Sequence, residues 1–215
     1  DGFSGTILTT APTVDLMSIA LMDSADIQEE DAAYKKRRHQ REGRTVDHPV
    51  VPLYTTEDVQ ATMPLVEEID YESPFQLGDN ISARFRDAGH IFGSAMIEIT
   101  VRENGNVRTL VFSGDIGQWD MPFVCDPSLF EKADYVVMES TYGDREHEDP
   151  GRIDELLGRV IRETAAAGGN VVIPTFAIER AQDLMFHLSR LVYDKAIPPL
   201  PVFLDSPMAR EVTQA

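Results

Sequence analysis

Hydrophobic and polar residues follow a different pattern in each half of the chain. In the first half, short alternating or apolar runs are separated by turn residues, which predicts β-strands at 6–10, 81–85, 95–101 and 107–112. Apolar residues at helical spacing predict helices that begin at Pro12 and at Thr56, the second ending near Glu68. The stretch 69–79 is rich in turn residues and predicts a loop.

The pair Asn104-Gly105 lies between two of these predicted strands and is a strong hairpin signal. A hairpin centred there places positions that sum to about 209 opposite each other, so Asp115 is expected opposite Ser94. We therefore expect His90 and Asp115, which are 25 positions apart in the sequence, to be neighbours in space.

The second half predicts a different architecture. An apolar strand at 134–138 is followed by alternating elements, which are a helix at 152–167, a strand at 171–174, a helix at 178–192, a strand at 201–204 and a helix after Ser206. Such βαβ alternation is typical of a parallel sheet covered by helices. The fold class is therefore expected to be α/β, with a boundary between residues 1–149 and 150–215 where charged residues and a Pro-Gly pair interrupt the pattern.

Composition narrows the choice of protein class. With 215 residues, 42% of them hydrophobic, the chain can bury a core for one large domain or for one domain and part of another. Its single cysteine, Cys125, excludes a disulfide framework and a cysteine-rich zinc module, so a metal would need His and carboxylate ligands. No apolar run approaches the roughly 20 residues of a membrane span, and we expect a soluble, cytoplasmic protein without a membrane partner.

The formal net charge of −18 argues against a broad basic surface that binds nucleic acid through phosphates alone. One basic segment, 35–44, ends the charged helix predicted over 23–44. A solvated helix whose cations complement its macrodipole is the simpler interpretation, and a nucleic-acid contact is the alternative.

Three acidic or imidazole side chains each follow a predicted strand. His90 lies in a Gly-His-x-x-Gly-Ser loop, Asp115 in Ser-Gly-Asp-x-Gly, and Glu139 before a Ser-Thr-Tyr-Gly turn. A carboxylate that bridges two cations beside a His nitrogen is the ligand chemistry of binuclear hydrolases. Glu139 either caps its own turn, orients a catalytic His or acts as an acid or base.

The other histidines and motifs add less. His39 and His187 are interpreted as surface or core residues, His48 as a loop residue, and His147 stays a candidate partner because it is close in sequence to Glu139. The chain contains no phosphate-binding P-loop, no Gly-x-Gly-x-x-Gly after a strand and no Gly-x-Ser-x-Gly elbow.

A set of five motifs over roughly residues 80–210 resembles the metallo-β-lactamase superfamily, in its β-CASP branch of RNA-processing nucleases. The motifs, in order, are Ala88-Gly-His90-x-x-Gly-Ser94, Phe112-Ser-Gly-Asp115-Ile-Gly117, Glu139-Ser-Thr-Tyr-Gly143, Gly169-Asn-Val-Val-Ile-Pro-Thr-Phe176-Ala-Ile-x-Arg180-Ala-Gln182 and Asp205-Ser-Pro-Met-Ala209. The resemblance implies part of an αββα sandwich and, from about residue 150, the start of an inserted β-CASP domain. It also implies that His90 and Asp115 bind two zinc ions, with Asp115 bridging, and that Glu139 orients a catalytic His.

By the same resemblance, the intact protein is expected to be a zinc-dependent phosphodiesterase acting on single-stranded RNA, with DNA as the alternative substrate and homodimerisation left open. The family's His-x-His-x-Asp-His signature is absent from these 215 residues. We therefore expect a piece of a longer protein that is inactive by itself. A hydrolase of a small ester or thioester and a non-catalytic scaffold subunit are the alternative functions.

Overall fold

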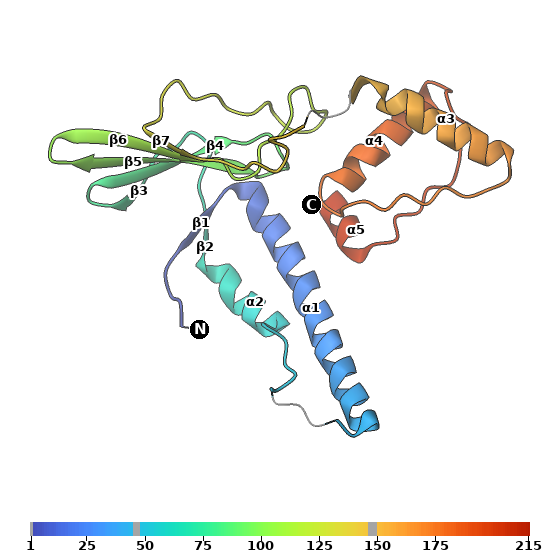
Figure 1. The fold of residues 1–215 in the computed structure, drawn as a ribbon, viewed down its shortest axis with the longest axis horizontal. Coiled ribbons are helices and arrows are strands. Elements are labelled where there is room, and N and C mark those ends of the chain that lie inside the picture. The colour runs from blue at the N-terminus through green and yellow to red at the C-terminus, as the bar shows by residue number, and fades with distance from the viewer. Residues whose placement is uncertain (1, 45–47, 146–149) are drawn as a thin grey trace.

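The computed structural model describes residues 2–44, 48–145 and 150–215, and shows a mixed α/β protein. A five-stranded sheet lies at one side, a long helix descends from it, and three further helices form the other side (Figure 1). The strands are β1 (Ile7–Thr9), β2 (Val66–Glu68), β3 (Phe75–Gly78), β4 (Ile81–Asp87), β5 (Ala95–Glu103), β6 (Asn106–Phe112) and β7 (Tyr135–Val137). The helices are α1 (Ala11–Glu42), α2 (Thr56–Thr62), α3 (Ile153–Ala166), α4 (Arg180–Tyr193) and α5 (Pro207–Gln214), with short 3-10 turns η1 (Met63–Leu65) and η2 (Pro150–Arg152).

The main sheet has the strand order β3-β4-β5-β6-β7. Its strands are antiparallel except β7, which runs parallel to β6. The hairpin between β5 and β6 has the predicted register, because Glu103 faces Asn106 and Ile97 faces Phe112. Its two turn residues both have positive φ, 50° at Asn104 and 78° at Gly105, as a two-residue hairpin of the right twist requires.

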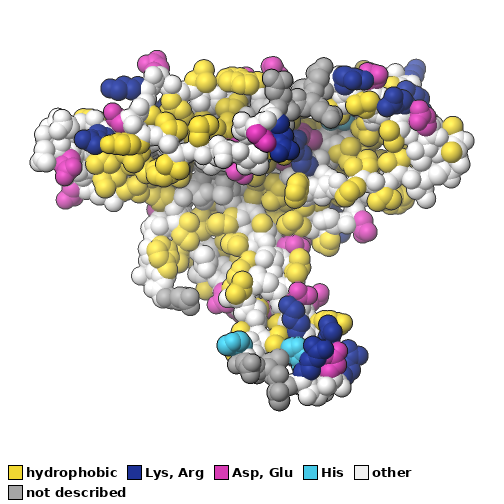
Figure 2. Space-filling model, viewed as in Figure 1, with side chains coloured by type: hydrophobic (Ala, Val, Ile, Leu, Met, Phe, Trp, Pro, Cys, Tyr) yellow, Lys and Arg dark blue, Asp and Glu magenta, His cyan; other side chains and the backbone are white. Residues whose placement is uncertain are grey.

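Helix α1 is a single element of 32 residues, so the apolar start and the charged end predicted from the sequence are continuous. It ends at Glu42, and the next residue, Gly43, caps it in the left-handed conformation with a φ of 61°. The basic side chains of its last turns gather at the far end of the molecule (Figure 2). Arg38 and Arg44 each form an exposed ion pair with Glu42, which agrees with a solvated helix end.

Two predictions in the first half are wrong. The helix that begins at Thr56 stops at Thr62, and the residues after it turn through η1 into β2, which pairs in parallel with β1. Within the predicted loop, residues 75–78 form β3 and pair with β4. Both errors have one cause: a neighbouring strand supplies the backbone hydrogen bonds that these short segments need, and local sequence does not reveal such a neighbour.

The helices of the second half are confirmed, with small shifts of their ends. α3 and α4 pack around a small core of Ile161, Leu191 and Ile197. Nδ1 of His187 lies 2.6 Å from Oδ1 of Asp154, so this histidine joins α4 to α3. The α5 start is also as expected, since the hydroxyl of Ser206 accepts a hydrogen bond from the N–H of Ala209.

The parallel sheet expected in this half is absent from the described residues. The segments 171–174 and 201–204 are irregular and not strands, and Val172 and Phe203 are 88% and 86% exposed. An apolar segment becomes a strand only where another strand pairs with it, and neither segment has such a partner in the described part of the chain. The apolar pattern alone was therefore misleading here.

The two halves meet where the ends of β4 and β6 approach the start of α4. Phe123, in the long connection between β6 and β7, contacts Phe186 of α4 edge to face, with ring centroids 5.2 Å apart. Helix α1 also contacts α5. The predicted boundary at residue 149 lies in 146–149, outside the described residues, and stays a prediction. None of the helices in the described ranges is long and apolar enough to cross a membrane.

Candidate active site

The loop between β4 and β5 carries His90, and its own side chains satisfy its backbone. Oδ1 of Asp87 accepts a hydrogen bond from the N–H of Gly89 at 2.8 Å. Oγ of Ser94 accepts two more, from the N–H groups of His90 and Ile91, at 3.1 and 3.2 Å. Such short-range bonds hold a loop in one conformation. The loop therefore presents the imidazole of His90 on a fixed backbone.

The start of α1 supports this loop from behind. The hydroxyls of Thr10 and Thr13 donate to the carbonyl oxygen of Gly93, at 2.7 and 3.0 Å. Gly93 has a φ of 81°, and a Cβ added to it would lie 2.4 Å from Oγ1 of Thr13. The glycine thus allows both the tight turn and the close approach of the helix.

The loop after β6, which carries Asp115, touches the His90 loop through backbone atoms. The N–H of Gly117 donates to the carbonyl oxygen of Ala88 at 2.8 Å. A Cβ at position 117 would lie only 1.6 Å from the carbonyl oxygen of Gly89. Residue 117 must therefore be a glycine for the two loops to pack in this way.

Glu139, just after β7, ties a third loop to the second. Its Oε1 accepts a hydrogen bond from the N–H of Ile116 at 2.7 Å, and its own N–H donates to Oγ of the buried Ser113 at 3.1 Å. The Ile116 N–H is the main cause that lowers the pKa of Glu139, followed by the Thr141 hydroxyl, while the attraction of His90 contributes less. Glu139 is therefore ionised at neutral pH and holds the residue next to Asp115.

His90 and Asp115 are neighbours, as the hairpin register predicted. Nε2 of His90 and Oδ2 of Asp115 are 3.9 Å apart, and the side chains are 37% and 72% exposed. Both line one pocket together with Glu139. The three residues singled out in the sequence therefore share one pocket, although the roles assigned to them stay predictions.

The opposite wall of this pocket is the start of α4, with Glu179, Arg180 and Asp183. Glu179 and Asp183 are 5% and 7% exposed. Burial is the first cause that raises the pKa of each carboxyl; the negative charge of Asp183 raises that of Glu179 further, and a backbone N–H of Phe92 partly offsets the rise. Because Phe92 belongs to the His90 loop, this contact joins the two walls.

The residues present supply part of a metal site. An imidazole nitrogen and a carboxylate oxygen that face the same space are a donor pair that zinc accepts, but a zinc ion takes at least three protein ligands. Within the ranges that the structure describes, no group of three or more His, Cys, Asp or Glu residues could hold a metal ion. His90 and Asp115 therefore fit as two members of a larger ligand set.

Other predictions from the sequence have separate outcomes. His39, His48 and His187 do not line this pocket, and His147 lies outside the described residues. Sequence reasoning gave no role to the α4 wall, although Arg180 stands in one of the motifs that carried the family resemblance. The buried carboxyls left no signal in the hydrophobic pattern, because a charged residue at the start of a helix is usually solvated.

Replacing Gly117 with Ala tests the contact between the two loops. The added methyl group cannot fit beside the Gly89 carbonyl, so we expect the free energy of unfolding to fall by about 1–3 kcal/mol or more. Gly78→Ala is the matched control, because a Cβ there meets nothing within 4 Å, and its effect should stay within about 0.5 kcal/mol. Urea unfolding measures both, and equal effects of the two variants would contradict the contact.

Replacing Glu179 with Gln tests the buried carboxyl. Because its pKa is raised in the folded protein, the unfolded chain ionises first, and stability is lost as the pH rises above about 4.3, the usual value of a glutamate. The variant should melt about 2–4 °C higher than the wild type at pH 8, the shift that about 1 kcal/mol gives, and show no gain at pH 4. The exposed Glu155→Gln is the control. A melting temperature at pH 8 that does not rise would disprove the assignment.

Comparison with known proteins shows which proteins this chain is similar to. No family model matches the chain. It is 34% identical over 212 residues to Ribonuclease TTHA0252 of Thermus thermophilus. This match covers 99% of this chain and 43% of that protein. It is 31% identical over 208 residues to transcription termination factor FttA of Methanosarcina mazei, covering 95% of this chain and 30% of the relative. An RNase J-like protein of Methanocaldococcus jannaschii is 29% identical over 202 residues, and the match covers 93% of this chain and 42% of that protein.

The chain thus spans less than half the length of each of these curated relatives. The matches nevertheless cover the whole region that contains the pocket, from the His90 loop to the start of α4. Along almost its entire length, this chain is a relative of proteins named as a ribonuclease, an RNase J-like protein and a transcription termination factor.

Proposed function

We propose that the full-length protein is a zinc-dependent phosphodiesterase that cleaves single-stranded RNA. In this proposal, residues 1–149 belong to a metallo-β-lactamase sandwich and residues 150–215 begin a β-CASP domain. The observation that carries the proposal is the convergence of His90 and Asp115, 3.9 Å apart, in one pocket with Glu139. The names of the relatives support RNA as the substrate.

His90 and Asp115 would hold zinc together with further ligands supplied by residues other than those described. Bound zinc would make a water molecule acidic enough to attack phosphorus at neutral pH and would stabilise the charge that develops on the phosphate oxygens. The exposure of both side chains toward the pocket fits this role, since a ligand must reach the ion without displacing the loop that carries it.

Glu139 would act by position. Its carboxylate holds the N–H of Ile116 and so fixes the backbone next to Asp115. Its lowered pKa keeps it ionised at neutral pH, which suits an acceptor of hydrogen bonds better than a proton donor. The same carboxylate lies in the pocket with His90 and would orient an imidazole that donates a proton to the leaving group.

A single strand suits the pocket better than a duplex. The pocket lies between the loops of the sheet and the start of α4, so a substrate enters between two walls. An unpaired strand is narrower than a double helix and can thread such a space with its phosphates toward the centre. DNA remains the alternative substrate.

The central experiment measures metal content and RNA cleavage in the full-length protein. The wild type should contain about two zinc ions per chain by mass spectrometry and cleave a labelled single-stranded RNA. His90→Ala should lose metal and cleavage together, by at least the roughly 10–100-fold seen when a residue that merely orients a ligand is changed. His48→Ala is the control, because His48 is exposed and lies outside the pocket.

Each other outcome points to an alternative function. Metal without RNA cleavage, combined with hydrolysis of a small ester or thioester, would replace the nuclease by a small-substrate hydrolase of the same superfamily. A wild-type protein without bound metal would identify a non-catalytic scaffold. A His90→Ala variant that keeps both metal and cleavage would reject His90 as a ligand.

Two Glu139 variants separate charge from hydrogen bonding. Glu139→Ala removes the acceptor of the Ile116 N–H, and we expect kcat to fall about 10- to 100-fold. Glu139→Gln keeps an acceptor oxygen and should recover much of that loss if the residue positions the Asp115 loop. Equal losses of kcat in the two variants would show that the negative charge of Glu139 matters and not the position of the loop. Measuring kcat of both variants across pH distinguishes these two explanations.

A further inference from the structure

The pocket as a whole is acidic, and the proposed chemistry gives no role to the one arginine among its described lining residues. Four of the described lining residues are carboxylic acids, which are Asp115, Glu139, Glu179 and Asp183. Among the described residues that line the pocket, Arg180 is the only Lys or Arg. A phosphodiester that enters this space meets mostly negative side chains, so a cation there has a large effect on binding.

The basic residues at the end of α1 cannot supply that cation. The start of α1 contacts the His90 loop, and its basic turns lie about 30 residues further on. A helix rises about 1.5 Å per residue, which separates the two ends by roughly 45 Å. Exposed charges are screened beyond about 8 Å at physiological salt. The basic end of α1 is therefore too far away to attract a phosphate in the pocket, and among the described residues Arg180 is the cation that lines it.

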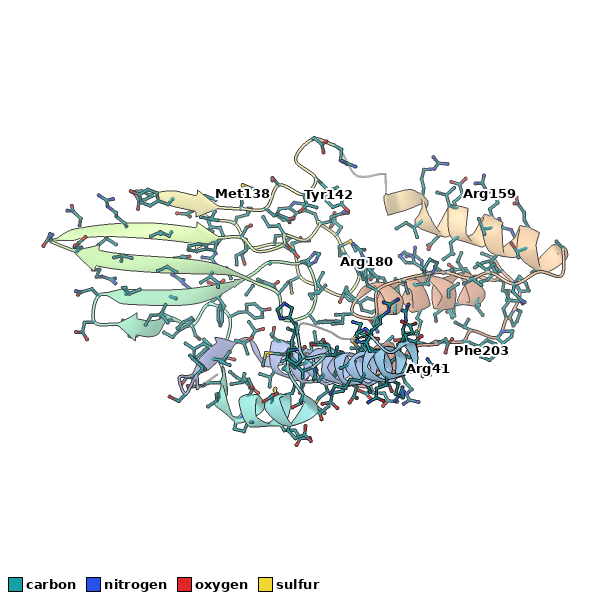
Figure 3. The ribbon with its side chains drawn as sticks, turned by 60° about the horizontal axis from the view of Figure 1, so that its bottom comes forward. Arg41, Met138, Tyr142, Arg159, Arg180 and Phe203 are labelled. Atoms are coloured by element: carbon teal, nitrogen blue, oxygen red, sulfur yellow. The ribbon has the colours of Figure 1, made fainter. Side chains whose placement is uncertain are left out.

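Arg180 is placed to contact a ligand. Its side chain is 53% exposed, and its Nη1 lies 3.5 Å from Oδ2 of the buried Asp183, one turn along α4. A guanidinium carries five N–H donors in a planar fork, and one carboxylate uses at most two of them. The ion pair thus orients the guanidinium and leaves donors for a second anion. Figure 3 shows Arg180 at the start of α4, where the helix meets the loops of the sheet.

Glu179 gives an independent indication that this wall binds something. It is 5% exposed, it lines the pocket, and its Oε2 has no hydrogen-bond partner. Its φ of 64° and ψ of −56° lie outside the regions that side-chain-bearing residues favour. Buried polar atoms without partners and strained backbone persist mainly at functional sites. The residue directly before Arg180 therefore has the properties of a ligand-binding position.

We propose that Arg180 binds the nonbridging oxygens of the substrate phosphodiester from the wall opposite His90 and Asp115, and that Asp183 positions its guanidinium. This subsite rests on the proposed nuclease function and names a contact for its substrate. Arg binds phosphate through two parallel hydrogen bonds, which fixes orientation as well as charge. The N-terminus of α4 adds positive potential in the same place.

Glu179 adds a further contact to this subsite. Burial raises the pKa of both Glu179 and Asp183, and the attraction of Arg180 opposes that rise at Asp183. The oxygen of Glu179 that lacks a partner can also accept a hydrogen bond from a ribose hydroxyl next to the bound phosphate.

The test measures cleavage of a single-stranded RNA by the full-length protein at several salt concentrations. In Arg180→Ala, KM should rise about 10- to 100-fold, the loss expected for a hydrogen bond to a charged group. The slope of log kcat/KM against log salt should become less steep by about 0.7, the value for one phosphate contact on a single strand. An ion pair that served only the fold would not change that slope.

Two further variants sharpen the comparison. Arg180→Lys keeps the charge without the fork, so it should preserve the salt slope and raise KM less than Arg180→Ala does. Arg159→Ala is the matched control, since Arg159 is exposed on α3 and does not line the pocket (Figure 3). Its salt slope should equal that of the wild type, and thermal melting confirms that each variant is folded.

Failure of this subsite is distinguishable from failure of the proposed function. If the wild type cleaves RNA and His90→Ala does not, an unchanged salt slope in Arg180→Ala overturns the subsite alone. An equal change of slope in Arg159→Ala overturns it as well, because the effect would then be general charge. A wild-type protein that neither binds nor cleaves RNA overturns both proposals.

Discussion

The backbone contact between the loops after β4 and β6 is the constraint on which the pocket depends. The hydrogen bond from the N–H of Gly117 to the carbonyl oxygen of Ala88 brings the two loops that carry His90 and Asp115 into van der Waals contact. Nothing larger than glycine fits at position 117, so the contact fixes the distance between the two loops. Glu139 then adds a third loop through the N–H of Ile116. None of these contacts uses the side chain of His90 or Asp115, which leaves both available for chemistry.

The opposite wall is built on a different principle. Around the start of α4, the structure buries two carboxyls and keeps a strained residue, Glu179. Each of these features lowers stability by itself. Natural proteins keep such local violations where binding or catalysis needs them, while the rest of the fold supplies the stability. The small core between α3 and α4, and the contact of Phe186 with Phe123, are the stabilising counterparts in this region.

The first half shows how far a local pattern reaches. The Asn-Gly turn fixed the β5–β6 register, and the register placed His90 near Asp115, because a two-residue hairpin allows one pairing of its strands. The same kind of pattern failed at β2 and β3, and again at 171–174 and 201–204. In each case the state of a short segment depends on whether a distant strand pairs with it. Helices were predicted more reliably because their hydrogen bonds form within the segment itself.

By itself, the sequence indicated most of the helices, the central hairpin and the proximity of His90 and Asp115 at the ends of strands. These features depend on residues close together along the chain, or joined by a single turn. Only the tertiary structure decided which short segments become strands, and which face α4 turns toward the pocket. It alone revealed Glu179, Arg180 and Asp183 as a second wall, because the loops that complete the pocket lie about 40 to 90 positions earlier in the chain. Burial is a property of the assembled molecule, and it has no signature in a short stretch of sequence.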